Sequence, residues 1–237
     1  ISCWNQELID YMIDNYNYNF LLEKCEVIDK SQIMELLYYT FYSTNFIFFE
    51  STLLPFLRNN KDFVEKNIYD IISSTFCDMS CYFTSEFFKF PNLDFNFLHK
   101  YDENEFTLLG MAIQHANFKA FEIILKNQNI KINEPAFNGL PAFHFACKCV
   151  INTNFLKLLS SYPNFDINAK DNIDSDTAFS MSLVNGNFMA VEFITSNFAN
   201  CLVEESEFSF YFYAGLIGNH IFMLKNVIEF IQKLMMN

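Results

Sequence analysis

The sequence predicts an all-α fold, built as an α-solenoid of about five to seven stacked helix–turn–helix units. The first observation is a short repeat: an asparagine, two further residues, an apolar residue and a second asparagine. It occupies residues 92–96, 129–133 and 164–168, so that its copies are spaced by 37 and 35 residues. The second is that an apolar segment with helical spacing precedes each copy. The third is that 5 Gly and 5 Pro in 237 residues are few for an all-β protein.

The two helices of each expected unit are marked by separate apolar segments. The second helix is expected at residues 8–13, 53–57, 83–88, 121–125, 155–159 and 191–194. The first helix is clearest at residues 106–113, which read Phe-Thr-Leu-Leu-Gly-Met-Ala-Ile. Two short helices and an extended, Asn-rich connection form a unit that buries its apolar face by stacking on its neighbours.

Residues 33–49 are the one candidate for a membrane-spanning segment. This run of 17 residues carries Glu35 and Asn45. A spanning helix needs about 20 mostly apolar residues. The polar residues at 43–45 divide the run into two segments of the size expected for a helix pair, so no membrane insertion is expected.

The expected first helices resemble those of the ankyrin-repeat family, whose unit of about 33 residues begins a helix with Thr-Pro-Leu-His-x-Ala. The matching segments read Thr-Leu-Leu-Gly-Met-Ala at 107–112, Pro-Ala-Phe-His-Phe-Ala at 141–146 and Thr-Ala-Phe-Ser-Met-Ser at 177–182. A fainter fourth is at 209–214. His144 stands in the family's histidine position. Gly186-Asn187, Gly218-Asn219 and Ala116-Asn117 match its turn between the two helices, where a positive φ is wanted.

The resemblance implies three regions. Residues 102–201 resemble the family repeat by repeat, and residues 202–237 resemble one more, terminal or capping repeat. Residues 1–101 keep the period without the signature, so they are either divergent repeats or a helical N-terminal cap. Unit boundaries are expected near Asn96, Asn133, Asn168 and Asn200.

The same register predicts how the units pack. The hydroxyls of Thr107 and Thr177 are expected to cap the first helices. Small residues are expected where neighbouring helices approach closely, and Ser182 there needs a local hydrogen-bond acceptor. The space between units is expected to be filled by Phe118, Phe121, Ile124 and Leu125.

Charge and cysteine usage exclude several classes of protein. The chain has 15 Lys+Arg and 28 Asp+Glu residues, which give a formal net charge of −13. This charge repels phosphate backbones and therefore disfavours nucleic-acid binding. The same charge favours a basic protein partner. The 7 cysteines are scattered among apolar residues and no secretion pattern precedes them. Reduced thiols in an intracellular, cytoplasmic protein are therefore expected.

No arrangement of residues indicates catalysis, a cofactor or a metal. His144 with Cys147, and Cys77 with Cys81, stand at helical spacing, but no second pair follows either one as a zinc site requires. Residues 171–176 fit only the first half of an EF-hand loop. We therefore expect no enzyme activity and no cofactor. His144 is expected to be buried and to hydrogen-bond to a loop backbone.

The resemblance implies that function resides in a protein-binding surface made by the hairpin tips and by the exposed start and end of each first helix. By register, the partner-binding residues are expected to be Glu103, Asn104, Phe106, Gln114, His115, Phe137, Asn138, Leu140, Lys148, Ile173, Asp174, Asp176 and Asn185. An adaptor or scaffold is the expected function. The alternative is a structural component of a larger assembly, or a regulatory repeat segment of a longer polypeptide.

Overall fold

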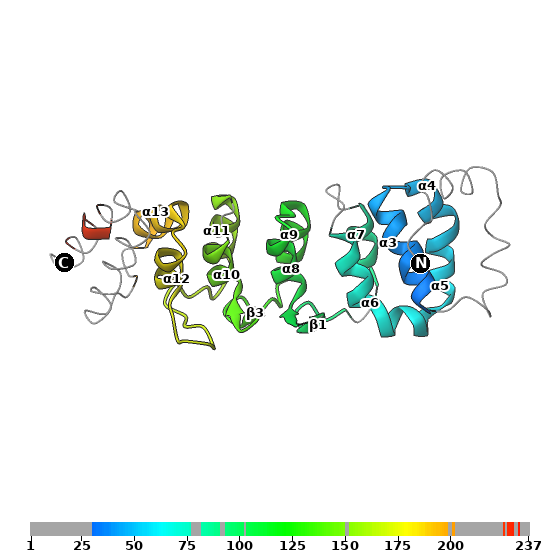
Figure 1. Ribbon diagram of the computed structural model, residues 1–237, viewed down its shortest axis with the longest axis horizontal. Helices are drawn as coiled ribbons and strands as arrows, with labels where there is room; N and C mark the ends of the chain where they lie inside the picture. The colour runs from blue at the N-terminus through cyan, green and yellow to red at the C-terminus, as the bar shows by residue number, and fades with distance from the viewer. Residues whose placement is uncertain are drawn as a thin grey trace. The chain divides into compact units, whose positions relative to one another are not determined.

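The computed structural model describes residues 30–76, 82–90, 93–101, 103–149, 152–198, 201, 225, 227–229 and 232. The chain divides into two compact units, residues 1–91 and residues 92–237 (Figure 1). Each unit is described by itself. Residues 8–13, 209–214 and 218–219, where further repeats were expected, lie outside the described residues, as do Cys77, Cys81 and Asn200.

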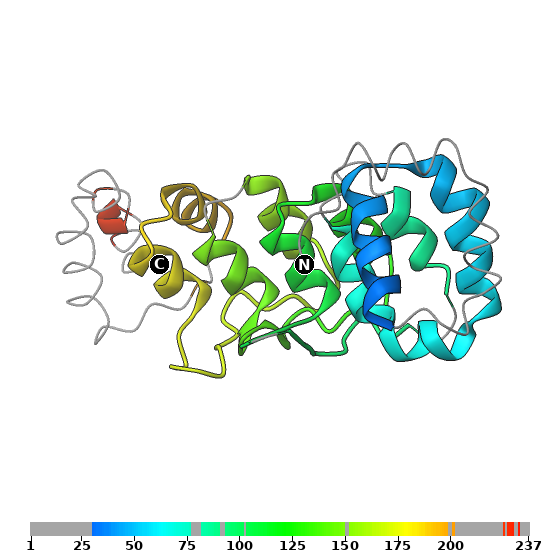
Figure 2. The ribbon, with the colours of Figure 1, turned by 45° about the vertical axis from the view of Figure 1, so that its right-hand side comes forward.

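The described part of unit 1 is helical. Its elements are α3 (Lys30–Tyr42), α4 (Phe46–Phe48), a π-helical turn (Phe49–Leu53), α5 (Leu54–Asn59), α6 (Lys61–Thr75) and α7 (Tyr82–Phe87). Figure 2 shows α3, in blue, beside α6, in cyan. The division expected at residues 43–45 is confirmed, because α3 ends before it and Thr44 has a φ of 53°.

Aromatic rings form the core of unit 1. The ring centroids of Phe41 and Phe83 are 4.8 Å apart, and those of Phe49 and Phe87 are 5.8 Å apart. All four side chains are fully buried. These contacts join α3, the π-helical turn and α7, and aromatic pairs of this kind stabilise a core beyond their buried area.

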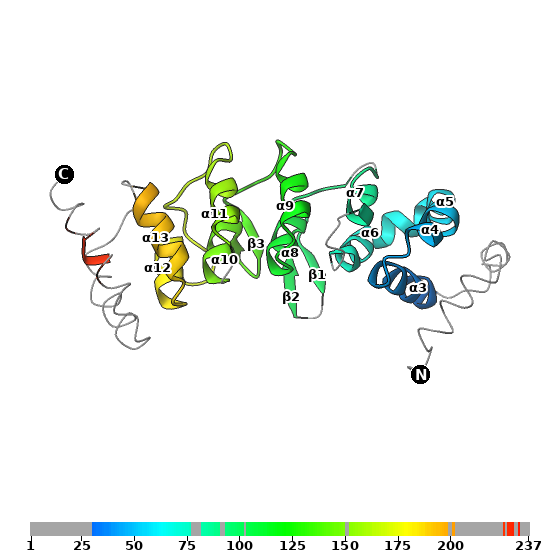
Figure 3. The same cartoon turned by 90° about the horizontal axis from the view of Figure 1, so that it is seen from above.

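The described part of unit 2 contains three helix pairs in successive layers (Figures 1 and 3). They are α8 (Leu108–Gln114) with α9 (Phe118–Leu125), α10 (Ala142–Lys148) with α11 (Thr153–Ser160), and α12 (Ala178–Val184) with α13 (Phe188–Asn197). The first helices α8, α10 and α12 pack side by side, and α11 packs on α13. Short helices of this kind depend on such packing, because they are marginal in isolation.

The all-α prediction is wrong: in the described part of the chain a four-stranded antiparallel sheet accompanies eleven α-helices. The strands are β1 (His99–Tyr101), β2 (Asn104–Phe106), β3 (Pro135–Phe137) and β4 (Leu140–Pro141), in the order β1-β2-β3-β4. The connections between helix pairs were expected to be extended and Asn-rich, with little or no sheet beyond short hairpin-like turns. Instead, Phe106 pairs with Phe137 and joins two hairpins into one sheet. Strands of two or three residues are too short to show alternating hydrophobicity in the sequence.

The N-termini of α8 and α12 are capped by the threonine side chains that the sequence predicted. Thr107 Oγ1 accepts from the Gly110 N–H at 3.2 Å, and Thr177 Oγ1 accepts from the Ser180 N–H at 3.3 Å, which confirms both caps. The turns before α9 and α13 also have the expected positive φ, 50° at Ala116 and 66° at Gly186. The asparagine that follows each turn caps the second helix with its side-chain oxygen.

The core of unit 2 lies between the helix pairs. Phe121 and Ile124 of α9 are fully buried, as expected, and the Phe121 ring lies 4.7 Å from the ring of Phe155 on α11. Phe118 is half-buried, but its ring also contacts Phe155, at 5.1 Å. Leu125 is only half-buried, so its placement in the core is corrected. The apolar face of α9 is centred on Phe121 and Ile124, and Leu125 lies at its edge.

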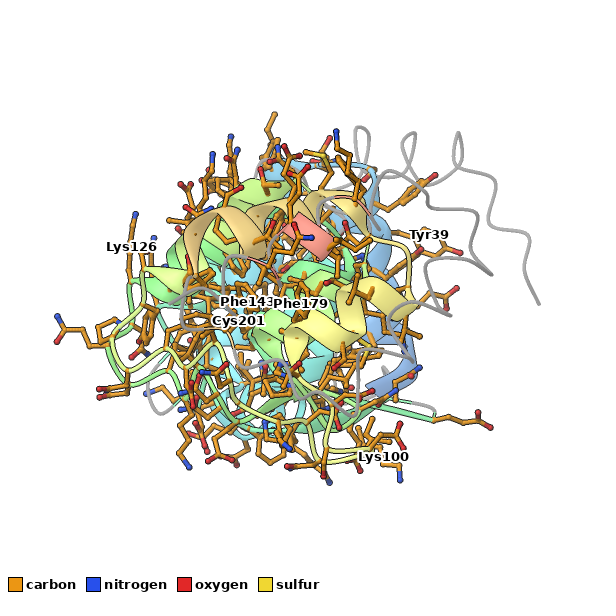
Figure 4. The ribbon with its side chains drawn as sticks, turned by 90° about the vertical axis from the view of Figure 1, so that its left-hand side faces the viewer. Tyr39, Lys100, Lys126, Phe143, Phe179 and Cys201 are labelled. Carbon is orange, nitrogen blue, oxygen red and sulfur yellow. The ribbon has the colours of Figure 1, made fainter. Side chains whose placement is uncertain are left out.

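Figure 4 shows the same division between interior and surface. Phe143 of α10, Phe179 of α12 and Cys201 lie within the fold, and each is no more than 3% exposed. Lys100 and Lys126 project outward. Ser182, which was expected to need an acceptor, is fully buried and donates to the Phe179 carbonyl O at 2.7 Å.

Candidate functional site

Asparagine side chains join the successive loops that precede the hairpins of unit 2. The Asn96 amide donates to the Asn129 carbonyl O at 2.9 Å, and Asn96 Oδ1 accepts from the Lys131 N–H at 2.8 Å. Asn133 repeats both contacts in the next layer, with the Asn164 carbonyl O at 2.6 Å and the Asp166 N–H at 3.1 Å. This asparagine ladder explains the sequence repeat, because the last asparagine of one copy binds the backbone that begins the next.

The hairpins are also joined to one another at their tips. The Asn138 N–H donates to the Glu105 carbonyl O at 2.8 Å, and Asn138 Oδ1 accepts from the Glu105 N–H at 2.7 Å. The Asn138 side chain also donates to Asn104 Oδ1, at 2.8 Å. On the other side, the Asn172 N–H donates to the Gly139 carbonyl O at 3.2 Å. The β1–β2 hairpin, the β3–β4 hairpin and a third hairpin at residues 170–177, which the antiparallel pair Lys170 and Thr177 closes, are thereby connected in series.

The turn at the tip of the second hairpin depends on positive φ angles. Asn138 and Gly139 have φ of 42° and 84°, the conformation of the tight turn that Asn-Gly favours between antiparallel strands. A Cβ atom at Gly139 would lie 3.0 Å from Cγ1 of Ile173 in the third hairpin. The positive φ favours glycine at this position, and a side chain there would also press on the exposed Ile173.

A buried carboxylate organises the third hairpin. Asp171 is 4% exposed, and its Oδ1 accepts from the backbone N–H groups of Ile173 at 2.8 Å and Asp174 at 2.9 Å. Its own N–H donates to the Asp176 carbonyl O at 2.9 Å. These bonds hold the tip in a turn, with Ser175 at a φ of 60°.

His144 connects α10 to this third hairpin. It is 2% exposed, and its Nε2 atom donates to the Asp176 carbonyl O at 3.2 Å, which confirms the expected contact with a loop backbone. Burial lowers the pKa of the imidazole, while backbone hydrogen bonds and the charge of Asp171 oppose that shift. His144 is therefore a neutral, structural side chain near neutral pH.

A second row of expected site residues lies at the C-terminal ends of the first helices. His115 follows α8, Lys148 ends α10 and Asn185 follows α12. The buried Asn187 holds the backbone on either side of Lys148, because its amide donates to the carbonyl O atoms of Cys147 and Cys149, both at 2.9 Å.

The expected site residues differ in how far a partner could reach them. The exposed ones are Glu103, Asn104, Gln114, His115, Lys148, Ile173, Asp174 and Asn185. Phe106, Phe137, Asn138 and Asp176 are half-buried. Phe137 stacks on Phe145 of α10 with ring centroids 4.1 Å apart, so part of its apolar area is used within the fold.

Leu140 does not belong to the accessible surface. It is 2% exposed, because β4 turns its side chain into the fold. The structure therefore corrects its assignment as a partner-binding residue.

Several residues of these surfaces were not expected from the sequence. Glu105 and Gly139 make the connections between hairpins, and the Asn-Gly dipeptide was the available signal for the second of these. Phe188 and Met189 expose apolar side chains at the start of α13. Nothing in the repeat register distinguished them from core positions.

Two findings among the described residues concern metal binding and thiol chemistry. No group of three or more His, Cys, Asp or Glu side chains among them could hold a metal ion. Burial raises the pKa of the Cys147 thiol well above its usual value, which disfavours the reactive thiolate. In the same described part of the chain, none of the helices has the length and apolar character needed to cross a membrane.

Comparison with known proteins adds no family assignment: no protein-family model matches this sequence, and a search of curated proteins finds no match.

Proposed function

We propose that this chain is a non-catalytic protein-interaction module that binds a protein partner through the tips of the hairpins in unit 2 and the ends of its first helices. The observation that carries the proposal is the serial connection of three hairpins through Asn138 and Gly139. A surface held in one conformation before binding loses less conformational entropy when a partner docks. The exposed tips are therefore suited to recognition.

The chemistry of the tips favours a partner with basic and apolar groups. Glu103, Glu105 and Asp174 are exposed acids, and Ile173 is an apolar side chain that is 58% exposed. Acidic side chains steer a basic partner toward the surface, and a central apolar contact holds it there. The net charge of −13 acts in the same direction.

We also infer that unit 2 is a divergent relative of the ankyrin repeats. Three features of the helix pairs support this inference: capping by Thr107 and Thr177, the buried His144, and the positive φ at Ala116 and Gly186. A cytoplasmic location is part of the proposal. The unpaired thiols of Cys147 and Cys149 favour a reducing compartment.

Site-specific photo-crosslinking in cells of the source organism tests the proposed surface. A benzophenone side chain at Asp174 should crosslink a discrete partner, and excess unlabelled chain should compete for it. The matched control places the same side chain at the exposed Glu122 of α9, where it should crosslink no discrete partner. Equal crosslinking from the two positions, or none from Asp174, would contradict the proposal.

A further inference from the structure

Unit 2 contains a pocket between the loop before β1 and the loop before β3. Its volume is about 180 Å³. Leu109, Ile130 and Ala136 form buried parts of its lining, each no more than 8% exposed. The remaining apolar lining comes from Phe95, Leu98 and Pro135.

The side chains of Asn96 and Thr107 in the pocket wall already have hydrogen-bond partners. Both polar atoms of the Asn96 side chain bind the backbone of residues 129–131 in the asparagine ladder. Thr107 Oγ1 caps α8. A ligand therefore gains little from hydrogen bonds to these two side chains, whereas the buried Leu109, Ile130 and Ala136 offer apolar contacts.

The volume limits the size of that occupant. A cavity of about 150 Å³ holds benzene, whereas pockets for drug-sized ligands and cofactors measure roughly 300–1,000 Å³. The pocket thus has room for one branched or aromatic side chain and is too small for a nucleotide.

The rim indicates how such a side chain is presented. Lys131 and Glu134 are exposed lining residues of opposite charge, and neither makes an ion pair within the described part of the chain. Phe97 and Leu98 continue the apolar surface outside, at 46% and 41% exposed. An apolar side chain flanked by polar or charged groups, as on a polypeptide, complements both features.

We propose that this pocket binds one apolar side chain, of leucine or phenylalanine size, from an extended segment of the protein partner. The proposal rests on the proposed function. Pro135 and Ala136 line the pocket and begin β3, which leads to the tip residue Asn138. Three strand residues span about 10 Å, so one bound segment of a few residues reaches both the pocket and the tip.

Methyl NMR of the full chain tests the pocket without a known partner. N-acetyl-L-leucinamide is the probe, and N-acetylglycinamide, which lacks the side chain, is the control ligand. The leucine probe should shift the methyl resonances of Leu109 and Ile130 saturably in the millimolar range, and the glycine compound should not. Shifts spread over exposed methyl groups such as those of Ile173, or none at Leu109 and Ile130, would overturn the proposal.

Two variants at the pocket wall sharpen the test. Leu98→Trp should fill the pocket. The affinity of the leucine probe should then fall by at least about tenfold, which corresponds to the burial of one aliphatic side chain. Phe97→Trp adds an indole at an exposed neighbour outside the lining and should leave probe affinity unchanged. Leu98→Ala, which removes one wall, should also weaken binding, and it covers the case in which the tryptophan variant misfolds. Equal probe affinity in wild type, Leu98→Trp and Leu98→Ala would refute the assignment.

The probe experiment does not involve the acids at the hairpin tips. If the leucine probe binds while the tip position at Asp174 crosslinks nothing, the pocket stands and the proposed surface fails. If Asp174 crosslinks a partner and the probe does not bind, the surface stands and the pocket assignment fails.

Discussion

The side-chain amide of Asn133 donates to the backbone carbonyl of Asn164 at 2.6 Å, across the boundary between two layers of unit 2. Asn133 Oδ1 accepts from the Asp166 N–H at the same place. One side chain therefore satisfies a donor and an acceptor of a loop that has no regular secondary structure. Such bonds fix the spacing of successive loops, and with it the position of the hairpins that follow.

Replacing Asn133 by Ala should destabilise the chain by about 1 kcal/mol, because two partly exposed backbone groups lose their partner. Urea denaturation measures the difference in the free energy of unfolding. Asn154→Ala is the control, since Asn154 is exposed on α11 and should change stability by less than about 0.5 kcal/mol. Equal effects of the two substitutions would show that the ladder contributes nothing to stability.

Gly139→Ala should destabilise unit 2 by about 1–2 kcal/mol, because alanine is strained at a φ of 84°. Its Cβ would also lie 3.0 Å from Cγ1 of Ile173. Denaturation of the single variants and of Gly139→Ala with Ile173→Ala separates the two causes. The double variant should recover only the part due to close contact, so full recovery would exclude backbone strain as a cause.

Phe121→Ala should destabilise the chain by about 3–5 kcal/mol, the usual range for a buried aromatic side chain. Leu125→Ala, on the same helix, should fall below the range of about 2–5 kcal/mol typical of a buried leucine, because Leu125 is only half-buried. Thermal or urea denaturation of the two variants compares the positions. A larger loss at Leu125 than at Phe121 would contradict the packing of α9.

His144 should make the stability of the chain depend on pH. Burial lowers its folded-state pKa below the unfolded value of about 6.5, so the unfolded chain binds more protons as the pH falls. The contribution of neutral His144 is therefore fully present above pH of about 6.5 and is lost as the pH drops below it. The urea midpoint of unfolding should therefore differ less between pH of about 7.5 and pH of about 5.5 in His144→Gln than in the wild type.

His115→Gln is the comparison for this experiment. Burial also lowers the pKa of His115, but the side chain is far more exposed than that of His144. Its replacement should change the pH dependence less. If both variants keep the full pH dependence of the wild type, other groups are responsible for it.

The sequence pattern located the repeating features better than it identified the fold class. Thr107, Ala116 and Gly186 have chemical roles that single residues reveal: a hydroxyl cap, and turns that need a positive φ. The sheet depends instead on Phe106 pairing with Phe137, a contact that no local pattern encodes. Strands of three residues give no period to measure.

The candidate surface was predictable to a similar extent. Register alone placed Glu103 and Asp174 at exposed tips, but it also placed Leu140 there, and that side chain is buried. The difference arises because Leu140 is a strand residue whose direction is set by pairing with Phe137. The pocket could not be predicted, since Leu98, Leu109 and Ile130 meet only through loop packing.

Neutralising the acids expected at the tips should slow partner association. The variant Glu103→Gln with Asp174→Asn and Asp176→Asn removes three negative charges, so the formal net charge changes from −13 to −10. Glu103 and Asp174 are exposed, whereas Asp176 is half-buried. Because exposed charges contribute little to folding, the substitutions at Glu103 and Asp174 should change the free energy of unfolding by less than about 1 kcal/mol. Steering by the acids acts on the encounter, so the association rate with the crosslinked partner should fall, and more strongly at low salt than at high salt.

A second triple variant separates local from global charge. Glu65→Gln with Glu122→Gln and Glu192→Gln removes the same number of charges from exposed positions on α6, α9 and α13. Surface plasmon resonance at two salt concentrations compares the association rates of both variants with that of the wild type. A slower rate in the tip variant alone assigns the effect to the hairpin tips, because overall charge is matched. An equal reduction in the two variants means that net charge steers the partner without a specific surface. An unchanged rate in both contradicts electrostatic steering by this chain.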